Sequence, residues 1–309
     1  MEVSQLWKQL SHELFLNVES GFLRDFREPG KANSRLAAWD PADTTMRFFK
    51  FLLYNQCKVK PDSFFRLYGQ IGNTSIGNPV TIRVVRAGRT ADVNIDHFLS
   101  VEEYCFLSAH LDMSGVTNVV EIGGGFGRTA QALLKLSGAV ESYTIIDLPN
   151  VLRLSSLYLK VVLEGREYEK MRFVDAFEYA DSSGKGPDRA DLAINIDSFQ
   201  EMTPQTIDFY MDKLVRKSRY FYSKNTVGKY RPETIGLDAC APEDLGEVFS
   251  LGRSRDVIDI FCNDELDTAR SRHIDAYRPS DQFAVVADAP LDIFPYYHQV
   301  LYGRTGQPA

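Results

Sequence analysis

Short apolar runs alternate with amphipathic stretches through the middle of the chain. The apolar runs predict strands at residues 118–122, 143–146, 171–174, 192–196 and 220–223. The stretches between them repeat apolar residues at helical spacing and predict helices over residues 129–136, 151–163 and 204–215. Because strands that alternate with helices build a mostly parallel sheet, we expect an α/β fold with a Rossmann-like sheet.

The region before this alternation has a different pattern. Leu6, Leu10, Leu14 and Val18 recur at helical spacing, and the apolar residues of 48–53 do so again. Residues 80–85 and 91–95 flank a glycine turn and predict a small hairpin. We therefore predict an N-terminal helical lobe with a hairpin over residues 1–100, serving as a lid, a substrate surface or an oligomer contact.

The remaining residues, 101–309, are predicted to form the cofactor-binding catalytic domain. A helix is expected over residues 101–111, and late strands at residues 283–286 and 301–302. Residues 225–281 have little periodicity until residues 257–261, so we expect an insertion there that faces the substrate.

Composition narrows the class of protein. An apolar content of 44% and a charged content of 25% are typical of a soluble globular protein. The net charge of −7 argues against a nucleic acid or an anionic membrane as the main partner. No signal peptide and no apolar run of ~18 residues is present, so we expect a cytoplasmic protein. The scattered cysteines and histidines show no metal-binding spacing, so no metal is implied.

A glycine-rich turn follows the strand at residues 118–122. Gly123, Gly125 and Gly127 alternate with other residues there, and Asp147 ends the next predicted strand. Glycines let the backbone approach a ligand closely, and a carboxylate at the next strand end accepts hydrogen bonds from ribose hydroxyls. The pattern predicts a site for a nucleoside-bearing cofactor.

Two cofactor classes fit this pattern. Residues 125–130 match the GxGxxA variant of the dinucleotide fingerprint, so an NAD(P)-dependent oxidoreductase is one alternative. Glu121, however, places an acid where a dinucleotide offers no cation, and Arg128 begins the helix where a pyrophosphate needs bare N–H groups. A further acid, Asp175, follows the third strand, where methyltransferases bind the adenine amino group. These features favour S-adenosylmethionine.

Longer segments carry a family resemblance. They are Glu-Ile-Gly-Gly-Gly-Phe-Gly-Arg at 121–128, Asp-Leu-Pro at 147–149, Asn-Ile-Asp-Ser-Phe-Gln-Glu-Met at 195–202, and residues 220–230 and 296–304. The chain resembles the sugar O-methyltransferases, a class I S-adenosylmethionine-dependent family found in antibiotic and polysaccharide clusters. The resemblance covers most of the chain from residue 39 onward and supports methyl transfer more directly than it supports the sugar acceptor.

The resemblance implies methyl transfer from S-adenosylmethionine to a hydroxyl of a sugar or glycosylated small molecule. With the residue pattern, it gives these expected cofactor contacts: Glu121, Gly123, Gly125, Gly127, Arg128, Asp147, Leu148, Asp175, Ala176, Asp197 and Ser198. A methyltransferase of a non-sugar small molecule, on oxygen or nitrogen, and a non-catalytic cofactor-binding subunit stay open as alternatives. Assembly into a homo-oligomer is left open as well.

Catalysis on a hydroxyl needs a base that takes its proton. Asp197 and Glu201 follow the fourth predicted strand, and His273 is the preferred histidine of the insertion, so these are the candidate catalytic residues. A cap for the helix beginning at Pro204 is an equal alternative for Glu201. The expected acceptor contacts are Gln200, Asn225, Lys229 and Tyr230.

Overall fold

The structure is a computed structural model. It describes residue 4 and residues 20–28, 46–86, 88–181, 186–235 and 242–306, apart from the side chains of residues 20, 46–48 and 242–245. The helix predicted around Leu6–Val18 lies outside the described residues. None of the helices within these ranges is long and apolar enough to span a bilayer.

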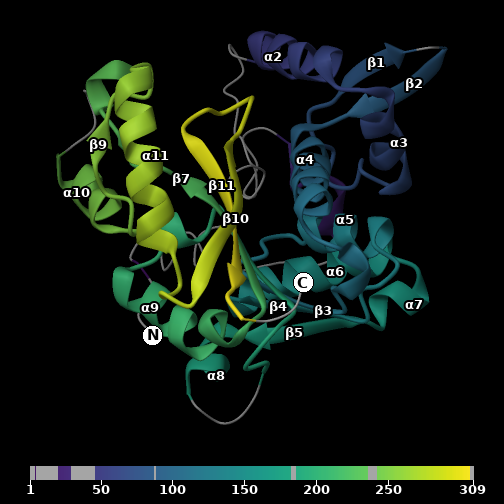
Figure 1. Ribbon diagram of the computed structural model, residues 1–309. Helices are drawn as coiled ribbons and strands as arrows, with labels where there is room; N and C mark the ends of the chain where they lie inside the picture. The colour runs from purple at the N-terminus through teal and green to yellow at the C-terminus, as the bar shows by residue number, and fades with distance from the viewer. Residues whose placement is uncertain are drawn as a thin grey trace. The chain divides into compact units, whose positions relative to one another are not determined.

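Seven strands form one sheet, in the order β10-β11-β7-β6-β3-β4-β5. They are β3 (Asn118–Ile122), β4 (Ser142–Asp147), β5 (Met171–Asp175), β6 (Leu192–Ile196), β7 (Tyr220–Thr226), β10 (Phe283–Pro290) and β11 (Tyr297–Arg304). The pairs β3/β6, β4/β5 and β6/β7 are parallel. Strand β11 runs antiparallel to both β7 and β10. Strands β10 and β11 are the long yellow pair of Figure 1.

The predicted α/β fold with a Rossmann-like sheet is confirmed. The chain leaves β3 toward β4 and β5, then returns to place β6 and β7 on the other side of β3. The strand order therefore reverses between β3 and β6, and open α/β sheets bind ligands beyond the carboxyl ends of the strands at such a point.

The described residues divide into two compact units. The first contains Ser4, Asn118–Gly123 and the described residues from Ala176 onward. The second contains the described residues from 20 to 117 together with Gly124–Asp175. The division of the chain at residue 100 stays a prediction.

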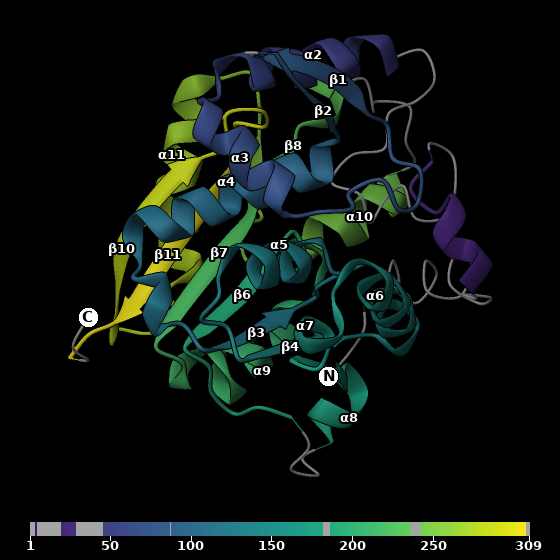
Figure 2. The same ribbon diagram turned by 90° about the vertical axis from the view of Figure 1, so that its right-hand side faces the viewer.

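The second unit contains the predicted hairpin, β1 (Ile82–Arg86) with β2 (Arg89–Val93). Its helices are η1 (Ser20–Arg24), α2 (Met46–Val59), α3 (Asp62–Gln70), α4 (Ile95–His110), η2 (Met113–Gly115), α5 (Arg128–Leu136), α6 (Pro149–Val162) and α7 (Gly165–Tyr168). Helix α3 lies against α4, as Figure 2 shows. Helix α4 begins earlier than predicted because the Asn94 side chain caps it, accepting a 3.1 Å hydrogen bond from the His97 N–H.

Arg27 is a buried cation in the second unit. Its side chain is fully covered and donates to Asp96 at 3.0 Å and to the Asn94 side chain at 2.9 Å. The guanidinium carbon also lies 5.0 Å from the centre of the Phe126 ring, in the glycine turn. The paired charge therefore ties η1's end, the start of α4 and the turn together.

His97 is buried beside this ion pair. Its Nδ1 lies 3.0 Å from the Asn94 side-chain oxygen, and its Nε2 lies 2.9 Å from Gln131 Oε1 and 3.1 Å from the Tyr158 hydroxyl. Burial, together with the nearby Arg27, lowers the pKa of His97 to about 3. The neutral ring is thus a satisfied part of the core rather than a residue of an open site.

The insertion of the first unit is more regular than predicted. The helices of this unit are α8 (Ala176–Ala180), η3 (Phe199–Glu201), α9 (Pro204–Lys213), η4 (Val215–Lys217), η5 (Pro232–Ile235), α10 (Pro242–Ser250) and α11 (Asn263–Tyr277), with β8 (Lys229–Tyr230) parallel to β9 (Val257–Ile258). The sequence did not indicate α11. Its buried residues are Leu266, Ala269, His273 and Tyr277. Only one of the four is a large aliphatic residue, so the apolar period was too weak to detect.

We expect acid to destabilise the fold through His97. The pKa of His97 in the folded protein is below the ordinary value of 6.5. Between these two pKa values the unfolded chain binds a proton at His97 and the folded protein does not. The stabilisation is complete above pH 6.5 and is lost as pH falls from 6.5 toward 3. Urea unfolding at several pH values measures this effect. The free energy of unfolding of His97→Gln should fall less steeply across this pH window than that of the wild type. His110→Gln, at the exposed end of α4, should keep the wild-type slope, and equal slopes for both variants would contradict the expectation.

Candidate functional site

The reversal of strand order brings the ends of β3 and β6 together. Ile122 is the register partner of Asn195, whose side-chain NH₂ donates to the Ile122 carbonyl at 3.0 Å. Gly123, which follows β3, has a φ of 73°, and a Cβ there would collide with the Ser198 side chain. Glycine is required at 123 because Ser198 occupies the space that a side chain needs.

Glycines 125 and 127 serve different purposes in the second unit. The Gly127 N–H donates to the Gly124 carbonyl at 3.0 Å, closing the turn. A Cβ on Gly127 would stand 2.8 Å from Leu159 Cδ1 of α6, so Gly127 permits helix packing. A Cβ on Gly125 would meet nothing within 4 Å in the described part of the chain. Gly125 therefore leaves the backbone of the turn open to close approach by a ligand.

Asp147 connects this turn to the end of β4. One carboxylate oxygen accepts the Gly125 N–H at 3.0 Å, and the other accepts the Leu148 N–H at 2.7 Å. Asp175, at the end of β5, is the register partner of Asp147. The two acids predicted to contact a nucleoside therefore stand side by side at adjacent strand ends, and Ala176 begins the following helix.

The Arg128 side chain forms a salt bridge with Glu103 that the sequence did not indicate. Its guanidinium donates to both Glu103 oxygens, at 2.8 and 2.9 Å, and to the Ser100 hydroxyl at 3.0 Å. This bidentate pair holds α5 to α4. The Arg128 group suited to a cofactor is thus its backbone N–H at the helix start. Glu121 is buried within β3.

Asp197 directly follows β6 and has an uncommon backbone conformation. Its φ is 58°, the left-handed region, which an aspartate tolerates better than most residues. Its N–H donates to the Lys224 carbonyl at 2.8 Å, and its carboxylate lies 3.4 Å from the Lys224 ammonium. The Lys224 side chain is 1% exposed and that of Asp197 is 27% exposed. A buried cation thus pairs with an acidic side chain that is still partly exposed.

Side-chain amides fix the turn after Asp197. Asn195 Oδ1 accepts the Phe199 N–H at 3.1 Å and the Asn225 NH₂ at 3.0 Å. Asn225 Oδ1 in turn accepts the Gln200 N–H at 3.2 Å. Residues from the 195–202 motif and from β7 therefore form one hydrogen-bonded set that holds η3.

Gln200 extends this set to further elements. Its side chain accepts the Thr226 N–H at 2.8 Å and donates to the Tyr297 hydroxyl at 3.2 Å, and its carbonyl accepts from the Lys229 ammonium at 3.2 Å. The structure thus brings Gln200, Asn225 and Lys229 together, and these bonds give each a structural role that the sequence did not reveal. Their contact with an acceptor stays a prediction.

Tyr230 lies among acids and other tyrosines. Its ring packs edge-on against Tyr296, with centroids 5.2 Å apart. Burial raises the pKa of Tyr230, Tyr296 and Tyr297, and the charge of Asp197 adds to each rise. We call these residues the acid–tyrosine cluster: Asp197, Glu201, Tyr230, Tyr296 and Tyr297. Glu201 is included because its charge also raises the pKa of Tyr230. The sequence did not single out Tyr296 and Tyr297 as site residues.

Lys229 stands beside this cluster. Burial, helped by Arg255, lowers its pKa to about 8, while Glu201 opposes the shift. The ammonium is thus less firmly protonated than a surface lysine, and Glu201 is its acidic neighbour.

His273 lies in the core of the first unit instead of an open surface. Its ring is 0% exposed, its Nδ1 lies 2.9 Å from the Ser254 hydroxyl, and its ring centre lies 4.8 Å from that of Tyr277. Burial lowers its pKa to about 3. Because the ring exposes no surface to an acceptor, we assign His273 a packing role. Asp197 and Glu201 are the candidate bases that are left.

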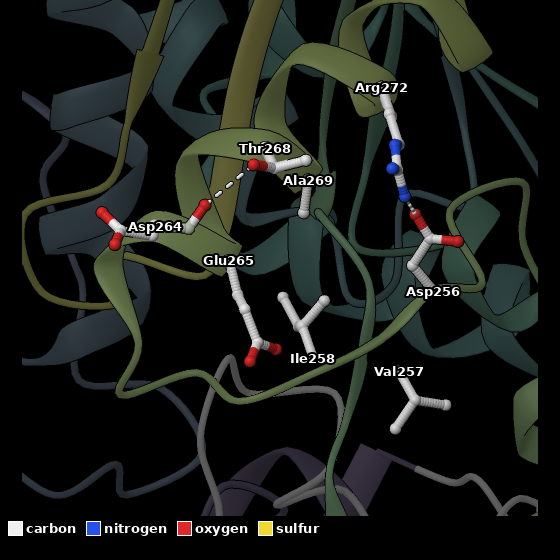
Figure 3. A pocket seen from close by; sticks show the side chains of 8 residues that line it. All are labelled: Asp256, Val257, Ile258, Asp264, Glu265, Thr268, Ala269 and Arg272. Carbon is white, nitrogen blue, oxygen red and sulfur yellow. Dashed lines mark hydrogen bonds and ion pairs between the residues drawn. The ribbon is translucent and has the colours of Figure 1, made fainter.

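A cavity of about 500 Å³ lies between β9 and α11 (Figure 3). Its apolar wall includes Ile258 and Ala269, and its charged wall includes Arg272, which pairs with Asp256 at 2.6 Å. Since β9 pairs with β8, the cavity is one strand away from Tyr230. Apolar and charged walls together suit a hydroxylated ring, whose C–H face and hydroxyls need different partners.

Comparison with known proteins gives distant structural similarity. No family model and no curated protein matches the chain. The mitomycin 7-O-methyltransferase MmcR is 17% identical over 67% of this chain and 55% of its own, with a TM-score of 0.41. The methyltransferase domain of bacterial CtHen1-C is 13% identical over 68% of this chain and 99% of its own, with a TM-score of 0.45.

Human N-acetylserotonin methyltransferase, solved in complex with SAM, is 13% identical over 67% of this chain and 53% of its own, with a TM-score of 0.41. The chain thus spans about half the length of the mitomycin and human enzymes. Similarity of this degree carries no activity over to this protein, so its function has to be argued from its own residues.

Alanine variants of Gly125 and Gly127 form a matched pair for a test of thermal stability. Gly127→Ala places a Cβ against Leu159 and also strains a residue whose φ is 96°. Gly125→Ala adds only the backbone strain, at a φ of 55° and a cost of ~1–2 kcal/mol. Thermal unfolding should show a larger drop in Tm for Gly127→Ala. An equal drop would mean that Leu159 moves aside freely.

Proposed function

We propose that the protein is an S-adenosylmethionine-dependent O-methyltransferase whose acceptor is a hydroxyl of a sugar or glycosylated small molecule. The observation that carries the proposal is the bond between the Asp147 carboxylate and the Gly125 N–H. It fixes an acid beside a turn whose backbone is open, and the two features together suit a nucleoside. The fold supports the proposal because its strand order reverses beside this turn.

The choice of cofactor rests on the acids. The Arg128 side chain is bound to Glu103, so it does not by itself separate the two cofactor classes. Glu121 within β3 and Asp175 at the end of β5 favour S-adenosylmethionine, which carries an ammonium group and an adenine amino group. We assign the ribose hydroxyls to Asp147, whose oxygens can accept more than one hydrogen bond each.

The same assignment gives the other cofactor contacts. We propose that Gly123, Gly125, Gly127 and the Arg128 N–H offer backbone to the cofactor, with Leu148 beside the ribose. Asp175 and Ala176 are assigned to the adenine, and Asp197 and Ser198 to the methyl-bearing end. S-adenosylmethionine, when bound, supplies a methyl group on a sulfonium.

Activation of the acceptor is assigned to the acid–tyrosine cluster. A hydroxyl is a poor nucleophile until a base takes its proton, and a positioned base contributes ~10²–10⁴-fold. Asp197 is the first choice because its side chain is partly exposed and its carboxylate pairs with the buried Lys224 ammonium. Glu201, in the same cluster, is the second.

The acceptor class follows from the surroundings of these acids. The Tyr230 and Tyr296 rings offer aromatic faces, and the cavity beside β9 offers carboxylates, Thr268 and Arg272. Such a mixture suits a sugar ring. The aromatic faces also favour one rival, a phenolic small molecule.

Cofactor binding can be tested by calorimetry. The wild type should bind S-adenosylhomocysteine and should not bind NADH. Asp147→Ala should weaken that binding about ten- to a hundredfold, because a hydrogen bond to a charged group contributes ~1.5–3 kcal/mol. Glu141→Ala, exposed just before β4, is the matched control and should bind normally. Binding of NADH alone would make the protein an oxidoreductase instead.

The base can be identified with isosteric variants and labelled S-adenosylmethionine. The wild type is first screened against nucleotide sugars, glycosides and phenols, and turnover of phenols alone would remove the sugar assignment. On the best acceptor, Asp197→Asn should lose ~10²–10⁴-fold in turnover. Glu201→Gln should lose less, and His273→Gln should change turnover only as far as it changes stability. Near-normal turnover by Asp197→Asn would exclude it as the base.

A further inference from the structure

Lys224 is not one of the acceptor contacts that we expect from the sequence. It lies in β7, the neighbour of β6, and is the register partner of Ile196. Its side chain is 1% exposed. A lysine ammonium is costly to bury unless it is paired, so this position needs a specific partner.

That partner is the carboxylate of Asp197, 3.4 Å away. The same lysine also accepts the Asp197 N–H through its carbonyl, at 2.8 Å. One residue of β7 therefore holds Asp197 twice, through the backbone and through the side chain. This double hold supports the left-handed backbone of Asp197, at a φ of 58°.

The other groups around Asp197 do not replace the charge of Lys224. Burial raises the pKa of Tyr230, Tyr296 and Tyr297, and the nearby charge of Asp197 raises it further. The three hydroxyls are therefore neutral at physiological pH. Among the charged neighbours, Glu201 is an acid and interacts with Lys229, whose ammonium donates to the Gln200 carbonyl.

The geometry points to Lys224 as a positioning residue for the methyl-transfer reaction: its buried ammonium keeps the Asp197 carboxylate ionised and aimed at the acceptor hydroxyl. The inference rests on the proposed function. The proton of the acceptor hydroxyl passes to Asp197 as the oxygen forms its bond to the methyl carbon, and the bond from that carbon to sulfur breaks with its electron pair staying on sulfur. Lys224 takes no proton in this step and acts through the charge of Asp197.

The test is the pH dependence of turnover for two variants of Lys224. Lys224→Met keeps the length of the side chain and removes the charge, whereas Lys224→Arg keeps the charge. A neighbouring opposite charge favours ionisation of a carboxyl by ~1–3 pH units. In Lys224→Met the acid limb of the pH–rate profile should therefore move up by about one unit or more, with turnover recovering at high pH. Lys224→Arg should keep the wild-type limb.

Lys217→Met, exposed just before β7, is the control for loss of a lysine and should match the wild type. A Lys224→Met enzyme that loses turnover equally at every pH would overturn the inference, because a purely structural role lowers activity without moving the limb. Affinity for S-adenosylhomocysteine, measured alongside, separates this outcome from failure of the proposed function, in which the wild type itself neither binds it nor transfers methyl groups.

A second measurement needs no turnover. In protein labelled with ¹³C at the aspartate carboxyl carbon, the resonance of Asp197 is identified by its loss in Asp197→Asn. Lys224→Arg should titrate like the wild type, and Lys224→Met should protonate Asp197 at a higher pH. If Lys224→Met does not fold, Lys224→Gln takes its place. Identical titration with and without the lysine charge would refute the inference.

Discussion

The candidate site depends most on the hydrogen bonds of the Asn195 side chain. Its NH₂ group donates to the last carbonyl of β3, and its oxygen accepts from the Phe199 N–H of η3 and from Asn225 of β7. One amide thus fixes the relative positions of three elements where the strand order reverses. Because it is fully buried, losing any partner would leave an unsatisfied polar atom, so the arrangement is rigid. The conformation of Asp197 and the fit of Ser198 against Gly123 follow from it.

The second unit uses the same principle with a charge in place of an amide. Arg27 is held by Asp96 and Asn94, and the ring of Phe126 lies under its guanidinium. Phe126 stands between Gly125 and Gly127, so the ring anchors the turn while Gly125 leaves its backbone open. Preorganisation of this kind matters for a cofactor site, because groups that are already fixed lose little entropy when a ligand binds.

The site residues divide by how much surface they keep. Asn225 and Lys224 are buried and bind other residues of the protein, whereas the Asp197 side chain is partly exposed. A base must be accessible to its substrate yet held in one orientation, and these requirements conflict on a flexible surface loop. Here they are met by placing the acid at a strand end and its supporting groups beneath it.

The sequence by itself determined the strands of the sheet, the helices that alternate with them, the glycine turn and the acids at the strand ends. These depend on local patterns, since apolar runs form strands wherever they can be buried and glycine fits a left-handed turn in any context. It did not determine that His273 is buried, that Gln200 and Asn225 bond within the protein, or that Lys224 pairs with Asp197. Gln200 bonds Tyr297 across 97 residues of chain, and no local period records such a partner. Burial and hydrogen bonding at the site were decided only when the tertiary structure brought distant strands together.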